Sequence, residues 1–386
     1  MGAAKSREGE ALPALSGARF RVRYLLSGDE PDARRKAEDI CLEQTVEFPA
    51  DLVPAGVVRD EIVGRLEAFG QVGPARYFAD ISFAVETAAD DLVQLLNVVF
   101  GNISIKPGIR VEALTLPQEI TTRFRGPRFG VGGLRQTLGI ALRPLISTAL
   151  KPMGLSPTAL ADQAYQFAAG GIDIVKDDHG LTDQSFCPFS ERVARCAEAV
   201  ARANTETGLK SIYVPNVTGP AGLLERRAEE ARSAGAGGLL LCPGLMGIDA
   251  LRFLAEHEDI RLPVLAHPSF TGSFVTAAES GISHAVLYGQ LMRLAGADAT
   301  VFPNYGGRFS FSREQCAGIA ALCAEEMGGL RPILPAPGGG MTADRAGDMR
   351  EVYGRDFILL IGAGLHRLGG DLRRNAAQFV ELVGRM

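Results

Sequence analysis

Residue types that can move protons or hold anions stand directly after short apolar runs in the second half of the sequence. The motif GGIDIVKDDHG joins Lys176, Asp177, Asp178 and His179. In a strand, Lys176 and Asp178 would share one face and Asp177 would point to the other, because successive side chains alternate. Similar residues close other runs, namely Lys151, Asn216, His267 and Asn304. Such a set is suited to proton transfer and to stabilising a negatively charged oxygen.

The role of each lysine is open from the residues alone. A lysine among carboxylates is commonly an ion pair, which is the simplest interpretation of Lys176. At the mouth of a barrel, the same lysine can instead be a base, or its neutral amine can add carbon dioxide and become a carbamate ligand for a divalent cation beside Asp178. Lys151 can hold a substrate oxyanion, act as an acid, or be a solvated strand end.

Two glycine clusters follow the last two apolar runs. They are Gly338, Gly339 and Gly340, and then Gly362 with Gly364. Glycine lets backbone N–H groups approach a ligand, and the loops after strands seven and eight of many barrels bind phosphate in this way. Plain turns use glycine too, but two clusters in the two expected loops favour a phosphate site.

The elements that must position these residues repeat regularly from residue 145 onward. Eight apolar runs recur about every 25 to 30 residues, and a helical stretch follows each one. This count predicts a parallel (β/α)8 TIM barrel. A doubly wound sheet is the alternative, but the sequence has neither GxGxxG nor GxxxxGK[ST]. The runs are LISTAL, IDIV, SIYVP, GLLL, PVLA, ATVFP, PILPAP and ILLI.

The first 120 or so residues have a different pattern. Strands are expected at 20–26, 77–85 and 110–116, with helices at 31–44 and 90–100. Antiparallel strands covered on one face by helices fit this order, so we expect an α+β domain of the ferredoxin-like kind. The stretch TTRFRGPRFGVGG then acts as a linker. The predicted domains are residues 1–125 (α+β) and 126–386 (barrel).

Composition narrows the class of protein. The chain has 386 residues, is 46% hydrophobic and carries a formal charge of -5. It is therefore too apolar for disorder, and it lacks the basic field that attracts nucleic acid or a membrane surface. Six cysteines without a CxxC pair are expected to be reduced and buried. The absence of a signal sequence and of a long apolar segment predicts a cytoplasmic protein with no membrane partner.

Three stretches together resemble the RuBisCO large-subunit superfamily. They are LKPMGLSP, GGIDIVKDDHGLTDQSFCPFSERV and YVPNVTG, and they resemble the family's first strand end, its KDDE metal motif and its NxT after strand three. Upstream, EQTVE at 43–47 and the pair Gly101–Asn102 occupy the family's N-terminal active-site positions. The resemblance covers nearly the whole chain up to Gly364.

The resemblance implies a role for each matching residue. Lys176 matches the carbamylated lysine, Asp178 a carboxylate metal ligand, Lys151 the first strand-one lysine and His267 a strand-five histidine. The substrate-binding positions, including a phosphate grip, are Glu43, Asn102, Asn216, Arg308, Gly338, Gly339, Gly340, Gly362 and Gly364. Glu43 and Asn102 are implied to reach the barrel of a neighbouring subunit, so a homodimer or higher homo-oligomer follows. Arg308 falls where carboxylases have a mobile lysine.

Departures from the family pattern argue against carboxylation. His179 replaces the second metal carboxylate, and KPMGLSP is one residue too short to hold the second strand-one lysine. Pro268 replaces an arginine and Val301 a histidine, and the sequence ends at Met386 without the tail that locks the closed carboxylase loop. The resemblance therefore implies a RuBisCO-like (type IV) protein that is not a ribulose-bisphosphate carboxylase.

The metal and the role of His179 are linked. The resemblance implies Mg²⁺ bound by Lys176, Asp178 and His179. Imidazole is nevertheless a poorer partner for Mg²⁺ than a carboxylate and suits transition metals better. His179 is then a metal ligand, a general acid or base, or a histidine that caps a loop.

The family's non-carboxylating members share one step, in which an enediolate forms next to a carbonyl and cationic groups stabilise it. Because Lys151 and Lys176 are kept while the metal motif is changed, we favour a 3-oxo-isoapionate-4-phosphate transcarboxylase/hydrolase that gives phosphoglycerate and glycolate. Its catalytic residues would be Lys151, Lys176, His179 and His267, acting on a small phosphorylated substrate. The alternatives are a 2,3-diketo-5-methylthiopentyl-1-phosphate enolase, a methylthioribulose-phosphate isomerase, and a non-catalytic binding or regulatory barrel.

Overall fold

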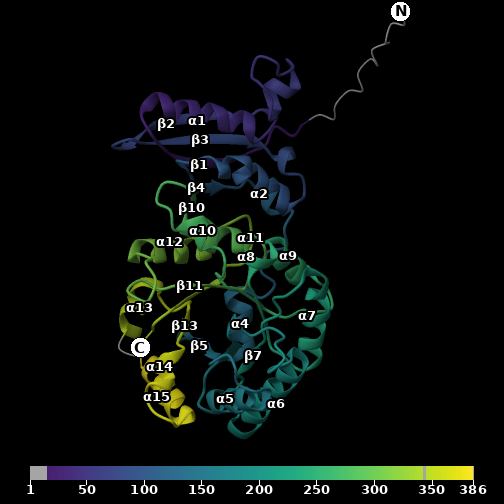
Figure 1. Ribbon diagram of the computed structural model, residues 1–386, viewed down its shortest axis with the longest axis vertical. Helices are drawn as coiled ribbons and strands as arrows, with labels where there is room; N and C mark the ends of the chain where they lie inside the picture. The colour runs from purple at the N-terminus through teal and green to yellow at the C-terminus, as the bar shows by residue number, and fades with distance from the viewer. Residues whose placement is uncertain (1–14, 342–344, 386) are drawn as a thin grey trace, which may run out of the picture.

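A computed structural model describes residues 15–341 and 345–385 of the chain. Figure 1 shows a sheet covered by helices at one end and a larger barrel at the other. The first domain runs in the order β1 (Arg19–Ser27), α1 (Glu30–Glu43), β2 (Arg65–Gly73), β3 (Arg76–Ala84), α2 (Leu92–Phe100) and β4 (Ile109–Thr115). Its strands are antiparallel and lie in the order β4-β1-β3-β2. This is the ferredoxin-like arrangement that the sequence predicts.

Strand β1 shows why this sheet has one covered face. Its residues alternate between buried apolar side chains, such as Val22 and Tyr24, and arginines, such as Arg21 and Arg23. The apolar face packs against α1, which begins after Asp29, whose carboxylate accepts a hydrogen bond from the backbone N–H of Asp32. The arginines lie on the opposite face of the sheet.

Eight parallel strands form the second domain, and each of them overlaps one of the eight predicted runs. Two four-stranded sheets have the orders β13-β5-β6-β7 and β12-β11-β9-β8. A bridge between Asn216 and Leu240 links β7 to β8, and β12 lies beside β13, so the barrel closes. The strands are β5 (Leu145–Leu150), β6 (Ile174–Asp177), β7 (Ile212–Val214), β8 (Leu239–Leu241), β9 (Val264–Ala266), β11 (Ala299–Pro303), β12 (Leu334–Gly338) and β13 (Ile358–Leu360).

Helices surround the barrel, as Figure 1 shows. The long ones are α5 (Pro157–Ala169), α6 (Phe189–Thr207), α7 (Leu224–Ser233), α9 (Asp249–Glu256), α12 (Arg313–Ala324), α13 (Ala346–Tyr353) and α15 (Leu372–Gly384), together with η5 (Ala285–Leu291) and its continuation α11 (Met292–Leu294). Short helical segments are η1 (Val58–Ile62), η2 (Val85–Ala88), η3 (Asn102–Ile105), α3 (Gln118–Thr121), η4 (Ala221–Leu223), α8 (Pro243–Met246), α10 (Gly272–Val275) and α14 (Ala363–His366).

A further helix closes the amino end of the barrel. Helix α4 (Gly130–Leu138) places Leu134 and Leu138 against the first inward-facing residues of the strands, such as Leu145 and Ile174. The carboxylate of Asp298 fixes the start of α4 by accepting backbone N–H groups from the segment that leads into it. The carboxyl end of the barrel is thereby the end left for a ligand.

The two domains share one sheet. The short strand β10 (Gly281–Ile282) from the barrel half pairs in parallel with β4 and extends the first sheet to five strands. The backbone N–H of Ser283 also donates to the carbonyl of Val111 at 2.8 Å. A division at residue 125 stays a prediction. The structure also shows that strand β10, from the barrel half of the chain, completes the sheet of the first domain.

Two further expectations concern the cysteines and membrane-spanning helices. All six cysteines are buried and none forms a disulfide, as the sequence predicts. Within the described parts of the chain, no helix combines the length and apolar character needed to span a bilayer.

Candidate active site

Alternation along the strands decides which side chains line the inside of the barrel. Ile174 belongs to the inner core cluster, so Lys176, two residues later, points inward one layer higher. Strand β6 is also shifted from its predicted position. Residues 172–173 belong to the turn before it, since the N–H of Ile172 bonds to the carbonyl of Phe167. Lys176 therefore lies within the strand, not after it.

Lys176 is nearly inaccessible, with 2% of its surface exposed. Its Nζ donates to the carbonyl of Asp177 at 3.1 Å. Burial lowers the pKa of Lys176 to about 8; the nearby Asp178 opposes this shift, and the positive charge of Lys151 adds to it. An amine in this state is partly neutral at physiological pH, and a neutral amine can accept a proton or add carbon dioxide.

Asp178 contacts cationic groups at the rim of the barrel, that is, at the carboxyl ends of the strands and the loops that follow them. Its Oδ1 lies 2.5 Å from Nζ of Lys151 and 3.4 Å from Nδ1 of His179. Burial would raise the pKa of Asp178, but the hydrogen bonds from His179 and Lys151 and the charges of Lys176 and Lys151 together hold that pKa below its usual range. The carboxylate is therefore ionised, and its ion pair holds Lys151 at the same rim as Lys176.

Asp177 points the other way, as the alternation requires, and has different surroundings. It is fully buried, and its carboxylate accepts hydrogen bonds from Nε of Arg192 at 3.0 Å, the hydroxyl of Tyr213 at 2.7 Å and the backbone N–H of Asn216 at 3.0 Å. The buried Arg192–Asp177 pair thus anchors the backbone that carries Lys176 and Asp178.

His179 and His267 stack on each other across the rim. Their ring centroids are 4.4 Å apart and the ring planes differ by 13°. Nδ1 of His267 lies 3.0 Å from the hydroxyl of Ser269 and 3.3 Å from its backbone nitrogen, and a neutral ring that accepts at Nδ1 carries its proton on Nε2. Burial, helped by the charge of Lys176, lowers the pKa of His267 well below its usual value. A neutral His267 can donate a hydrogen bond through Nε2.

Asn216 organises the loop after β6. Its Nδ2 donates to the carbonyls of His179 and Leu181, both at 2.9 Å, and its side chain is fully buried. These contacts fix the loop that presents His179. A contact between Asn216 and substrate stays a prediction.

One glycine cluster borders Lys151, and the other borders the loop of Arg308. A Cβ placed on Gly362 would lie 4.0 Å from Cε of Lys151, so this cluster borders that lysine. A Cβ on Gly364 would lie 2.7 Å from the carbonyl oxygen of Met341. Gly339 has a φ of 90°, and its carbonyl accepts the N–H of Arg308 at 3.0 Å. A side chain at Gly364 would collide with backbone, and the φ of Gly339 favours glycine, whereas Gly362 has room for one.

Glu43 and Asn102 meet each other, but in the first domain. Nδ2 of Asn102 donates to Oε1 of Glu43 at 3.1 Å, and Nζ of Lys106 lies 3.6 Å from the other carboxylate oxygen. Within the described residues, no hydrogen bond or ion pair joins either one to the barrel lysines of its own chain. Figure 1 places α1 and α2, which lead to these residues, in the sheet domain.

The inward-facing Cys242 is not among the predicted site residues. Cys242 follows β8 two residues after the inward-facing Leu240, so the same alternation puts its thiol inside the mouth. Burial raises its pKa, while Thr218, Ser269 and the charge of Lys176 act in the opposite direction. Applying the period of two to the residues just after each strand would have found it.

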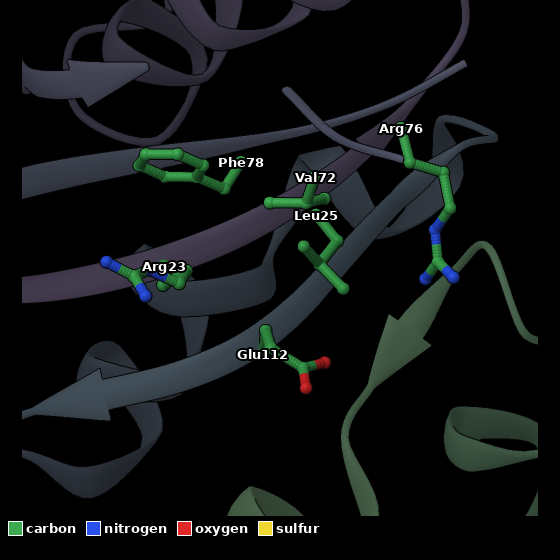
Figure 2. Close-up of a pocket in the computed structure, with 6 residues that line it drawn as sticks. All are labelled: Arg23, Leu25, Val72, Arg76, Phe78 and Glu112. Carbon is green, nitrogen blue, oxygen red and sulfur yellow. The ribbon is translucent and has the colours of Figure 1, made fainter. Parts of the chain in front are cut away.

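Two cavities lie away from the rim. One of about 490 Å³ opens on the arginine face of the first sheet, and Figure 2 shows the six side chains around it. A second, of about 400 Å³, lies at the amino end of the barrel and includes Arg143 and Asp173. Each contains one close ion pair, Arg23 with Asp80 and Arg143 with Asp173. We place the candidate site at the rim because Lys151, Asp178 and the stacked pair His179 and His267 meet there. The first cavity is lined by Arg23, Leu25, Val72, Arg76, Phe78 and Glu112.

Comparison with known proteins agrees with this geometry. The family model described as "Ribulose bisphosphate carboxylase large chain, catalytic domain" matches residues 130–371. The chain belongs to the RuBisCO large-chain family. It is 39% identical to ribulose bisphosphate carboxylase-like protein 1 of Rhodopseudomonas palustris, over 95% of this chain and 97% of that one. It is thus one of the RuBisCO-like (type IV) members.

Two further RuBisCO-like relatives carry names that state an activity. The 5-methylthioribulose-1-phosphate isomerase of Rhodospirillum rubrum is 35% identical, over 95% of this chain and 96% of that one. The 2,3-diketo-5-methylthiopentyl-1-phosphate enolase of Geobacillus thermodenitrificans is 34% identical, over 94% of this chain and 92% of that one. Both names describe enzymes that act on phosphorylated keto compounds.

Solved structures show the same fold. The RuBisCO-like protein from Rhodopseudomonas palustris superposes with a TM-score of 0.86 at 38% identity, covering 95% of this chain and 97% of that one. An octameric RuBisCO from Pyrococcus horikoshii gives 0.88 at 26% identity, covering 96% of this chain and 88% of that one. These neighbours agree with the predicted α+β domain followed by a barrel.

RuBisCO-family proteins generally use Mg²⁺, so the fit of such an ion to these residues matters. Within the described residues, no three His, Cys, Asp or Glu side chains are grouped as a metal site. Asp178 holds Lys151 through an ion pair, and His179 offers nitrogen where Mg²⁺ prefers oxygen. The donor set does not fit Mg²⁺ well, and we derive no catalytic step through it.

Proposed function

We propose that this RuBisCO-like protein forms an enediolate from a phosphorylated keto acid, and that it is a 3-oxo-isoapionate-4-phosphate transcarboxylase/hydrolase, not a ribulose-bisphosphate carboxylase. One observation carries the proposal. Lys151 is held at 2.5 Å from Asp178 on the rim that also holds the buried Lys176, while His179 stands where a second metal carboxylate would be. The rim supplies positive charge and proton carriers without a full set of oxygen ligands.

A β-keto acid suits such a rim. When its carboxyl group leaves, the electron pair of the broken carbon–carbon bond moves onto the ketone oxygen. The Lys151 ammonium and the Nε2–H of His267 can stabilise that oxygen, because preorganised donors act most strongly where negative charge develops. The neutral amine of Lys176 can take up or return the proton.

The named products set the rest of the reaction. Phosphoglycerate and glycolate together retain every carbon of the substrate, so the released carbon dioxide has to be recaptured on the other enediolate carbon. Water then cleaves the new β-keto acid into the two products. The reaction therefore needs a rim that keeps carbon dioxide from escaping.

The phosphate end of the substrate is assigned to the glycine loops. Gly339 and Gly340 have φ values of 90° and 98°, and Gly362 borders Lys151. Backbone N–H groups in such loops bind phosphate, and Arg308 beside them adds a guanidinium group. This arrangement would hold the phosphate near enough to the lysines for the keto carbon to reach them.

A second copy of the chain would complete the rim. Large apolar side chains are exposed on the loops that follow the strands, among them Met153, Leu245 and Phe270. Near Glu43 and Asn102, Phe48 and Ile105 are exposed as well. Apolar side chains of this kind mark an association surface where they form a contiguous patch. We propose a homodimer or higher homo-oligomer in which the first domain of one subunit covers the barrel of its partner and retains carbon dioxide.

Isomerisation or enolisation of a methylthio-sugar phosphate is the second candidate. It is supported by the names of the Rhodospirillum rubrum and Geobacillus thermodenitrificans relatives. Both reactions begin with removal of a proton next to a carbonyl, which the same lysines can perform. The two candidates differ in whether carbon dioxide is released and recaptured.

The decisive test supplies both substrate types to the purified protein. With 3-oxo-isoapionate 4-phosphate, we expect phosphoglycerate and glycolate by ¹³C NMR. With 5-methylthioribulose 1-phosphate or 2,3-diketo-5-methylthiopentyl 1-phosphate in deuterated water, exchange or isomerisation would favour the second candidate. No turnover of any of them, together with a raised melting temperature in their presence, would indicate a binding or regulatory barrel.

A further inference from the structure

The loop after β11, which carries Arg308, is fastened to the glycine run after β12. The N–H of Asn304 donates to the carbonyl of Gly338 at 2.7 Å, and the N–H of Arg308 donates to that of Gly339 at 3.0 Å. A Cβ on Gly307 would lie 2.2 Å from the carbonyl oxygen of Gly339, so the two backbones touch. The contact requires glycine at position 307.

A second set of bonds fastens the same loop from the side of α13. Nη1 of Arg345 donates to the carbonyl of Tyr305 at 2.8 Å. The hydroxyl of Tyr305 donates to Oδ2 of Asp348 at 2.7 Å. The loop is therefore tied at both its strand end and its middle. Movement as a lid would break bonds to two separate elements.

The side chain of Arg308 is directed by its neighbour Phe309. The guanidinium carbon lies 5.2 Å from the centroid of the Phe309 ring, within the range of a cation–π contact. The ring in turn packs on the glycine run, since its Cδ2 would be 3.2 Å from a Cβ on Gly339. The stem of Arg308 also lies over Gly340, with Cγ 3.3 Å from a Cβ built there.

We propose that Phe309 is a positioning residue and that Arg308, Phe309 and the glycines at 339–340 form a preformed clamp for a phosphate group. The clamp rests on the proposed phosphate site and goes beyond it. It holds its cation in place before the ligand arrives, where a carboxylase has a mobile lysine. Phe309 acts through Arg308 and does not itself bind the anion.

Binding of inorganic phosphate, measured by calorimetry on the wild-type protein and on variants, tests the clamp without any catalytic substrate. Arg308→Gln should weaken phosphate binding at least about tenfold, because it removes a charged donor. Phe309→Leu keeps the apolar bulk but removes the ring, and should weaken binding about threefold. Phe309→Tyr keeps the ring and should bind as the wild type does.

The control is Phe253→Leu, which changes another exposed phenylalanine on the outer helix α9. It should leave phosphate affinity unchanged, and melting temperatures without phosphate should show that all variants are folded. A wild-type protein that does not bind phosphate overturns the clamp. So does a Phe309→Leu variant that binds as tightly as wild type, or a Phe309→Tyr variant that is as weak as Phe309→Leu.

Hydrogen exchange tests whether the clamp is preformed. The amide of Arg308 should be protected in the ligand-free protein, because it already bonds to Gly339. Protection that arises only when phosphate is added would overturn a preformed clamp. Both measurements are independent of turnover, so the clamp can fail while the transcarboxylase/hydrolase proposal stands, and the reverse also holds.

Discussion

The two ends of the barrel use the same residue types in opposite ways. At the amino end, the carboxylate of Asp298 accepts backbone N–H groups from Phe129, Gly130 and Val264, at 2.7, 2.7 and 2.9 Å. At the carboxyl end, Asp178 holds Lys151 at 2.5 Å and His179 only at 3.4 Å. Lys151 itself keeps 37% of its side chain exposed.

This difference distinguishes carboxylates that stabilise the fold from carboxylates that can interact with a ligand. A buried carboxylate whose oxygens are all engaged by fixed donors gains nothing from a ligand, whereas a partly paired group at a rim can exchange its partner for one. The two kinds of carboxylate occur at adjacent residues. Asp177 is fully paired with Arg192 and Tyr213, whereas Asp178 is not. Substitution of Asp177 should therefore mainly affect stability, and substitution of Asp178 should mainly affect activity.

The largest effect is expected at Lys176. Lys176→Met keeps the length of the side chain and removes the amine, so turnover should fall about 10³-fold if the amine transfers the proton. Stability should be unchanged or slightly higher, because a buried amine no longer has to be desolvated. NMR of product formation measures the first effect and thermal unfolding the second. A variant that retains more than a tenth of wild-type turnover would remove Lys176 from the mechanism.

Asp177→Asn should instead reduce stability. It leaves the guanidinium group of Arg192 buried without its counter-ion, which costs about 3 to 5 kcal/mol. Urea unfolding measures the free energy of unfolding. The matched variant Asp178→Asn, one residue along, should lose most activity but little stability, because its ion pair with Lys151 is partly exposed. Equal losses of stability in both variants would contradict the proposed difference between Asp177 and Asp178.

A fourth substitution tests the amino end of the barrel. Asp298→Asn puts an amide group against three backbone donors and leaves at least one of them without an acceptor. The free energy of unfolding should fall by about 2 to 3 kcal/mol. Turnover per folded molecule should stay at the wild-type value, because the proposed site lies at the other end. A changed KM would show that the structure at the amino end of the barrel affects substrate binding at the rim.

Local pattern was enough to predict the barrel and much of its rim. LISTAL and ATVFP coincide with β5 and β11, because buried parallel strands are continuous apolar runs closed by polar residues. The same pattern placed Lys176 and Asp178 on one face. Neither the partner of Asp177 nor the stacking of His179 on His267 could be predicted, because both depend on side chains from other strands and helices.

Two strands were missed for different physical reasons. Strand β2 (Arg65–Gly73) is an edge strand with no buried residue and two glycines, so it lacks the alternation that marks a half-buried strand. Strand β10 is two residues long and exists only because β4 of the other domain lies beside it. Pairing between domains leaves no trace in a local window of sequence.

The smallest effect is expected at the junction that β10 creates. His284 lies next to β10 with 5% of its surface exposed, and its ring meets Phe311 edge-on with centroids 4.4 Å apart. Burial, together with the charge of Arg110, lowers the pKa of His284 to about 4. Between this value and the unfolded value near 6.5, the unfolded chain binds more protons than the folded one. Stability from His284 is therefore full above pH 6.5 and is lost as the pH falls toward 4.

Replacing His284 should flatten this pH dependence. Between pH 7 and pH 5, the wild-type protein should lose about 1 to 2 kcal/mol more stability than His284→Gln, measured by urea unfolding at each pH. His284→Leu also removes the titrating ring and should flatten the dependence by the same amount, although its absolute stability differs. If both variants keep the wild-type slope, acid sensitivity lies at the rim, where burial also lowers the pKa of His267. That result would mean that the rim, and not the domain junction, limits the stability of this barrel in acid.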